Sequence, residues 1–74
     1  MTKTEFQKET SLLKIMNNVK EIGNHRIACV MFHFLPWKLV VSNDDFDKIA
    51  DRSYEPIIAF RTRDELWKHI KSTI

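Results

Sequence analysis

His25, Cys29 and His33 carry side chains that bind transition metals, and each lies four residues from the next. On a helix, this spacing would place all three on one face and create a candidate zinc site. On a strand, successive members would share a face but lie about 13 Å apart, because each residue advances the chain by roughly 3.3 Å. The β-branched and aromatic residues around them favour a strand. We therefore expect neither a metal site nor a cysteine–histidine dyad, and we expect Cys29 to be a small buried hydrophobic residue.

A second group of potential ligands is the acidic cluster of Asp44, Asp45, Asp47 and Asp51. Carboxylates bind calcium and magnesium, but the glycine and the terminal glutamate of an EF-hand loop are missing. The first three aspartates lie at the start of a predicted helix, where negative charge complements the helix dipole. We expect them to be structural rather than metal ligands.

Signatures of catalysis are missing from the chain. No serine lies in a G-x-S-x-G elbow, and a single glycine cannot build a phosphate-cradling loop. Hydrolysis by paired carboxylates needs a cleft that separates their pKa values, and a chain with three short strands has little room for one. We expect a protein that is not an enzyme and that needs no cofactor.

The N-terminal part of the chain predicts one long helix from Thr4 to Ile22. Thr4 and Gln7 have the spacing of a capping box, and apolar residues recur three and four positions apart. Gly23, the only glycine, follows the last of these positions, where helices often end in a left-handed conformation. Residues 1–3 are expected to be loosely held.

The run Ile27–Leu35 is apolar on both faces of an extended chain, which predicts a central strand. Pro36 cannot donate a hydrogen bond to a sheet and biases Leu35 away from helix, so the strand should break there. A second strand is expected from Lys38 to Ser42, and the two should form a hairpin around Pro36 and Trp37.

Capping signals mark the remaining elements. A short helix is expected from Ser42 to about Asp51, and Pro56–Arg61 should form a third strand that begins with a proline. Thr62 and Glu65 form a capping box that opens a final helix.

The expected fold class is therefore α+β, with a three-stranded mixed sheet, made of a hairpin plus one strand, and three helices in the order α-β-β-α-β-α. A right-handed crossover would make the third strand parallel to the second. The 74 residues should form a single domain, 1–74. A domain of this size buries only about 60% of its unfolded surface, so its stability margin should be thin.

The composition is that of a folded protein, with 43% hydrophobic and 30% charged residues. The single cysteine excludes an internal disulfide and suits a reducing cytoplasm. The first ten residues have no apolar core of a signal peptide, and no run reaches the roughly eighteen apolar residues of a membrane helix. We expect a soluble cytoplasmic protein that has no membrane association.

The apolar hairpin predicts an interface. A strand that is apolar on both faces needs cover on both sides, and three helices, one of them short, supply too little of it. The expected partner-binding residues are Phe34, Leu35, Trp37 and Lys38. They predict a non-catalytic interaction protein that binds a protein partner or forms a homodimer. In its small size and lack of motifs, the chain is similar to the accessory proteins with which bacteriophages inhibit or redirect host machinery.

A nucleic-acid-binding regulator is the alternative. Its candidate contacts are the basic residues of the last strand and helix, Arg61, Arg63, Lys68 and Lys71. A net charge of +2 is too small to indicate nucleic-acid binding by itself. The RNP signature of RRM sheets is also missing. Residues 42–55 hold five acidic and two basic residues between two basic segments, so this acidic segment is either a solvated surface or a docking surface.

Overall fold

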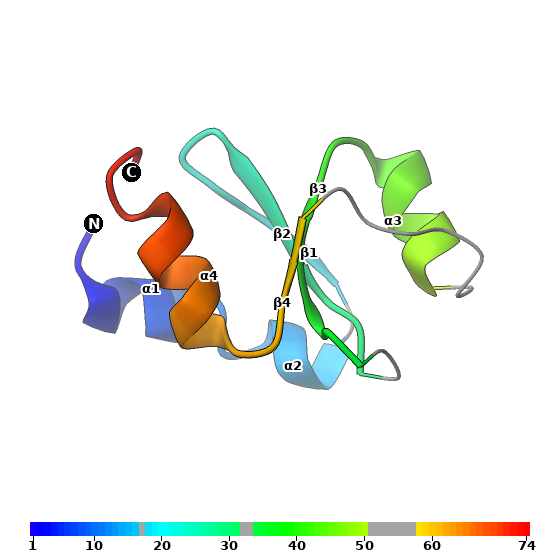
Figure 1. Cartoon of the computed structure of the whole chain (residues 1–74), viewed down its shortest axis with the longest axis horizontal. Coiled ribbons are helices and arrows are strands. Elements are labelled where there is room, and N and C mark those ends of the chain that lie inside the picture. Colours follow the sequence, from blue (N-terminus) through cyan, green and yellow to red (C-terminus); the bar gives the residue numbers. More distant parts are fainter. Residues whose placement is uncertain (17, 32–33, 51–57) are drawn as a thin grey trace.

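The computed structural model describes residues 1–16, 18–31, 34–50 and 58–74, and it shows an antiparallel sheet with helices on both faces (Figure 1). The strands stand in the order β1-β2-β3-β4: β1 (Val19–Ile22), β2 (His25–Cys29), β3 (Trp37–Val40) and β4 (Ile58–Phe60). The helices are α1 (Lys3–Glu9), α2 (Leu13–Met16), α3 (Asn43–Ala50) and α4 (Arg63–Ile70). The α+β class is confirmed, but the described residues form four strands and four helices in the order α-α-β-β-β-α-β-α, where three of each were predicted in the order α-β-β-α-β-α.

The long helix predicted from Thr4 to Ile22 is wrong, because α1, α2 and β1 occupy this stretch. The capping box lies two residues earlier than predicted. The Thr2 hydroxyl accepts the Glu5 backbone N–H at 3.2 Å, and the Glu5 carboxylate accepts the Thr2 backbone N–H at 3.1 Å. The spacing of the apolar residues is typical of a helix, but Val19 and Ile22 are β-branched and pair with β2 as part of a strand.

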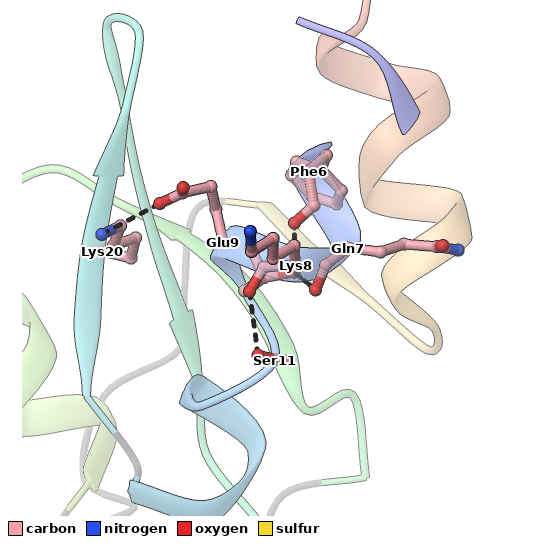
Figure 2. A network of polar contacts seen from close by, with 7 residues as sticks. Phe6, Gln7, Lys8, Glu9, Ser11 and Lys20 are labelled. Atoms are coloured by element: carbon pink, nitrogen blue, oxygen red, sulfur yellow. Dashed lines mark hydrogen bonds and ion pairs between the residues drawn. The ribbon is translucent and has the colours of Figure 1, made fainter. Parts of the chain in front are cut away.

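Polar contacts hold the end of α1 against its neighbours (Figure 2). The Thr10 hydroxyl donates to the Phe6 carbonyl at 2.7 Å, and the Ser11 hydroxyl donates to the Lys8 carbonyl at 2.8 Å. The Lys20 ammonium on β1 lies 3.2 Å from the Glu9 carboxylate. This ion pair is nearly half exposed, so it contributes little to stability.

Gly23 has a positive φ of 59°, as its sequence position suggested, but in a hairpin turn rather than at a helix end. Gly23 and Asn24 join β1 to β2, and the register places Ile22 opposite His25. A Cβ atom at Gly23 would lie 2.6 Å from Cγ2 of Ile74. The turn therefore needs glycine for its backbone conformation and for the close approach of the C-terminus.

The predicted hairpin is confirmed, since β2 and β3 pair antiparallel with Cys29 opposite Trp37, but Trp37 is the first residue of β3 and not part of the turn, as had been predicted. The Val30 backbone N–H donates to the Pro36 carbonyl at 3.0 Å and closes the loop between them. β2 ends at Cys29 rather than at Leu35.

The expected parallel third strand is wrong, because β4 pairs antiparallel with β3 and sets Leu39 opposite Ile58. β4 therefore begins beside the end of β3, so the chain returns at the same end of the sheet and makes no crossover. Residues 51–57, which include the predicted strand start at Pro56, lie outside the described residues.

Two layers of apolar side chains cover the sheet. On one face, α1, α2 and α4 pack with the strands around this cluster: Phe6, Leu13, Ile22, Ile27, Cys29, Trp37, Leu66 and Ile70. On the other face, α3 covers a smaller cluster: Ala28, Val30, Val40 and Ile49. β2 is thus covered on both faces, as its apolar sequence indicated.

Both predicted helix starts in the second half of the chain are confirmed. The Ser42 hydroxyl accepts the Asp45 backbone N–H at 3.2 Å at the start of α3, and the Thr62 hydroxyl accepts the Glu65 backbone N–H at 3.2 Å at the start of α4.

Within the described ranges, none of the helices combines the length and the apolar character that crossing a membrane requires.

Candidate functional site

The loop between β2 and β3 exposes large apolar side chains at one end of the sheet. Phe34 is 83% exposed, Met31 49% and Leu35 36%. We call Met31, Phe34 and Leu35 the loop surface. Phe34 and Leu35 were both predicted from the sequence as partner contacts, and the structure places them where a partner could reach them. Phe32 and His33 lie outside the described residues.

Trp37 and Lys38, the other two predicted partner contacts, are buried instead. Trp37 belongs to the larger apolar cluster, and Lys38 is only 1% exposed. Lys38 stands between Ala28 and Ala59 on the neighbouring strands, and its Nζ has no hydrogen-bond partner among the residues that the structure describes. Burial lowers the pKa of Lys38, although the nearby Cys29 acts in the opposite direction. A partner on the loop surface would therefore not touch this ammonium group.

A pocket of about 400 Å³ adjoins the loop surface. It is built from α2, the end of β2, the start of β3 and the connection between β4 and α4. Its lining residues are Lys14, Cys29, Met31, Pro36, Trp37, Arg61, Thr62 and Arg63. Among the described residues, the lining thus combines three cationic side chains with mainly apolar ones and includes no carboxylate.

At the pocket, two of the predicted partner contacts lie beside two of the predicted nucleic-acid contacts. The Arg61 guanidinium carbon lies 5.7 Å from the centre of the Phe34 ring, and that of Arg63 lies 5.8 Å from the Trp37 ring. Both distances allow cation–π attraction. Arg63 also donates from Nη1 to the Gln7 carbonyl at 3.2 Å, which ties it to α1.

The remaining predicted basic contacts, Lys68 and Lys71, do not line the pocket. Both are exposed, farther along the chain on α4 and at its C-cap. Lys14, by contrast, was not predicted as a site residue. In the long helix that was predicted from the sequence, nothing distinguished Lys14 from other polar residues. In the structure, α1 and α2 are separate helices, and Lys14 on α2 lines the pocket.

Acidic groups pair elsewhere in the described structure. Its ion pairs join Lys3 to Asp64, Lys20 to Glu9 and Arg26 to Glu21, so none includes a pocket cation. The Glu65 carboxylate accepts the Arg61 backbone N–H at 3.3 Å, which occupies it at the start of α4. The aspartates of α3 lie on the opposite side of the sheet from α4 (Figure 1). The pocket is therefore a local centre of positive charge.

Cys29 is the nucleophile nearest to this charge, and its burial keeps it unreactive. Burial raises the pKa of the thiol, and this effect outweighs the opposite influence of Lys38, Lys14 and Arg63. The thiol is therefore protonated at neutral pH and is a poor nucleophile and a poor metal ligand.

The metal-ligand spacing noted in the sequence does not form a cluster in the described residues. His25 lies at the other end of β2 from Cys29, where its Nε2 is 2.6 Å from the Thr73 hydroxyl. Asp45 accepts the Ser42 hydroxyl at 3.0 Å as part of a helix cap. Across the described ranges, no three histidine, cysteine or acidic side chains lie close enough to hold a metal ion. His33 and Asp51 fall outside those ranges.

Comparison with known proteins gives no family assignment. No family model, no curated protein and no solved structure matches the chain.

Proposed function

We propose that the protein is a non-catalytic interaction protein that binds an acidic protein partner through the loop surface. The observation that carries this proposal is the exposure of the Phe34 ring, at 83%, next to Met31 and Leu35 on one hairpin loop. Aromatic residues and methionine are enriched in protein interfaces, and contiguous exposed apolar patches mark binding sites. Arg61, within cation–π distance of Phe34, adds positive charge at the edge of the patch. An acidic rim on the partner would complement it.

Phe34→Ala is expected to weaken partner binding about 30-fold, because full burial of one aromatic anchor contributes about 2 kcal/mol. The partner is first captured on immobilised protein and identified, and its affinity is then measured by calorimetry. Val41→Ala is the matched control, since Val41 is 63% exposed but follows the opposite end of β3 from the loop. Equal affinities for the wild-type protein and the Phe34→Ala variant would rule the loop surface out.

A second copy of the chain is one partner of this chemistry. The exposed aspartates of α3, Asp44 and Asp47, could meet the pocket cations of another molecule. Sedimentation velocity of the wild-type protein and the Phe34→Ala variant distinguishes self-association from binding of a different protein. The acidic segment would then be a docking surface.

The setting that we propose is the cytoplasm, where the lone thiol of Cys29 stays reduced. A phage-type accessory protein that inhibits or redirects host machinery would act in this way, through a surface and without an active site.

Single-stranded nucleic acid is the second candidate partner, and the position of the Arg61 guanidinium beside the exposed Phe34 ring favours it. An exposed ring beside cations is a platform on which bases stack, while the phosphates contact the basic groups. Lys68 and Lys71 on the outer side of α4 could extend the contact.

If this second partner is the real one, binding of a labelled oligonucleotide must weaken steeply with salt. Three phosphate contacts on a single strand predict a slope of about −2 in a plot of log affinity against log salt concentration. Fluorescence anisotropy over a salt series measures this slope, and Lys68→Ala with Lys71→Ala tests the outer helix. Binding that is absent, or that does not respond to salt, would eliminate nucleic acid as a partner.

A further inference from the structure

The pocket brings together three cations that have no ion-pair partner in the described structure. Lys14 comes from α2, Arg61 from the connection between β4 and α4, and Arg63 from the first position of α4. Like charges in one pocket repel each other, and a bound anion would replace this repulsion by attraction. The ring contacts of Arg61 and Arg63 and the bond from Arg63 to Gln7 hold the two guanidinium groups in place without an anion. The arrangement is therefore a preformed anion site.

The size of the pocket shows that an inorganic anion would not fill it. Its volume of about 400 Å³ lies within the range of roughly 300–1,000 Å³ that is usual for sites of small organic ligands. Apolar side chains make up most of the remaining lining: Cys29, Met31, Pro36 and Trp37. The matching ligand thus has an anionic end and an apolar body.

A ligand that carries both a phosphate group and a planar aromatic ring fits this lining best. Guanidinium groups bind phosphate through paired hydrogen bonds, and a lysine adds a point charge. The Met31 thioether and the Trp37 indole are groups that make favourable contacts with aromatic rings. The first turn of α4 is already capped by Thr62, so the helix terminus is not needed for this site.

We infer that the pocket binds a nucleotide, with its phosphate among Lys14, Arg61 and Arg63 and its base against Met31, Pro36 and Trp37. This goes beyond the proposed protein contact, which centres on Phe34 and Leu35; the two sites share Met31 and adjoin at Arg61. The nucleotide is either free or one unit of a single strand, because both sources present the same phosphate and base.

Trp37 is a built-in reporter of this pocket. The only other tryptophan, Trp67, packs against Phe6, with ring centres 5.2 Å apart, and does not line the pocket. In a Trp67→Phe background, the fluorescence of Trp37 should change saturably on titration with adenosine, guanosine, cytidine or uridine monophosphate. Calorimetry on the wild-type protein confirms the affinity without an optical probe. Nucleosides without phosphate should bind at least tenfold more weakly, and inorganic phosphate alone should also bind more weakly.

Variants of the three cations test the assignment. Lys14→Gln, Arg61→Gln and Arg63→Gln should each weaken nucleotide binding about tenfold, the loss expected for one charge-assisted contact. Lys68→Gln, on α4 outside the pocket, is the matched control and should change affinity less than twofold. Leu35→Ala should also leave mononucleotide binding nearly unchanged, because Leu35 belongs to the loop surface but does not line the pocket, and this variant separates the two sites. Circular dichroism confirms that each variant is folded.

The two sources of the nucleotide give different results. If a short oligonucleotide binds much more tightly than any mononucleotide, the source is a single strand, whereas equal or weaker binding of the oligonucleotide identifies a free nucleotide. Either result supports the site, provided that the cation variants weaken binding. The inference is wrong if no nucleotide binds more tightly than about 1 mM, a free energy near −4 kcal/mol. It is also wrong if nucleosides bind as well as nucleotides, or if only a carboxylate-rich peptide competes for the pocket.

Discussion

Replacing Lys38 with methionine is expected to stabilise the fold by about 1–4 kcal/mol at neutral pH, the gain found when buried charges give way to apolar groups. Lys38 is 1% exposed, and its Nζ has no hydrogen-bond partner in the described part of the chain. The desolvation of the ammonium group is therefore not compensated by any such bond. Methionine keeps the unbranched shape and removes the charge, so the space beneath α3 stays filled.

The pH dependence of this gain follows from the lowered pKa of Lys38 in the folded state. The unfolded chain keeps a lysine pKa near 10.5, so between the two pKa values the unfolded state binds more protons than the folded state. The stability of the wild-type protein therefore rises with pH through this window. The advantage of Lys38→Met is largest below the folded-state pKa and shrinks as the pH approaches 10.5.

Urea denaturation of both proteins at pH 7 and pH 10 measures this difference. Lys20→Met, on β1 of the same sheet, is the control, because Lys20 is 44% exposed and makes a surface ion pair with Glu9. Its removal should change stability by less than about 1 kcal/mol at either pH. If Lys38→Met were neutral or destabilising at pH 7, the buried ammonium group must find a partner in solution.

Local signals in the sequence correctly predicted the starts of α3 and α4 and the hairpin between β2 and β3. The Thr62 cap with Glu65 three residues later, and the Ser42 cap with its acidic first turn, need no knowledge of the rest of the chain. Pro36 in the same way marked the hairpin, because a residue without an N–H cannot continue a central strand. Such signals depend on a few neighbouring residues, so they survive in any tertiary setting.

The first half could not be predicted in this way, because its apolar positions fit two structures. Val19 and Ile22 are three residues apart, which suits a helix, yet they are also β-branched and find partners on β2. Gly23 signalled a positive φ, but a helix end and a two-residue hairpin turn both require one. Long-range pairing decided between them, and a sequence pattern does not contain it.

The sequence predicted Arg61 and Arg63 of the pocket as basic contacts, and it predicted the loop surface from the shortage of cover for apolar side chains. Phe34 and Leu35 follow from the excess of apolar side chains in a small domain. Lys14 and the burial of Lys38 do not, because lysines are placed on the surface by default. Both depend on how α2 and α3 close over the sheet. Lys38 nevertheless influences a residue of the pocket, because its charge acts to lower the pKa of Cys29.

Phe6→Ala is expected to destabilise the protein by about 3–5 kcal/mol, the cost typical of removing a buried aromatic ring. Phe6 is fully buried, and its ring centre lies 5.2 Å from that of Trp67 on α4. α1 has only seven residues, too few to be stable without tertiary contacts, so it depends on this side chain for docking. Since domains of this size have thin margins, a large fraction of the variant should be unfolded at room temperature.

Urea denaturation followed by circular dichroism measures the loss, and the fluorescence of Trp67 reports on α1 directly. Phe34→Ala removes the same ring at an 83% exposed position and should change stability by less than about 0.5 kcal/mol. The contrast between two phenylalanines separates the cost of an empty core from the loss of an exposed ring. If Phe6→Ala altered the Trp67 signal and left the main unfolding transition in place, α1 would be an independent flap. The integrity of the pocket would then depend on α1 only through the bond between Arg63 and the Gln7 carbonyl.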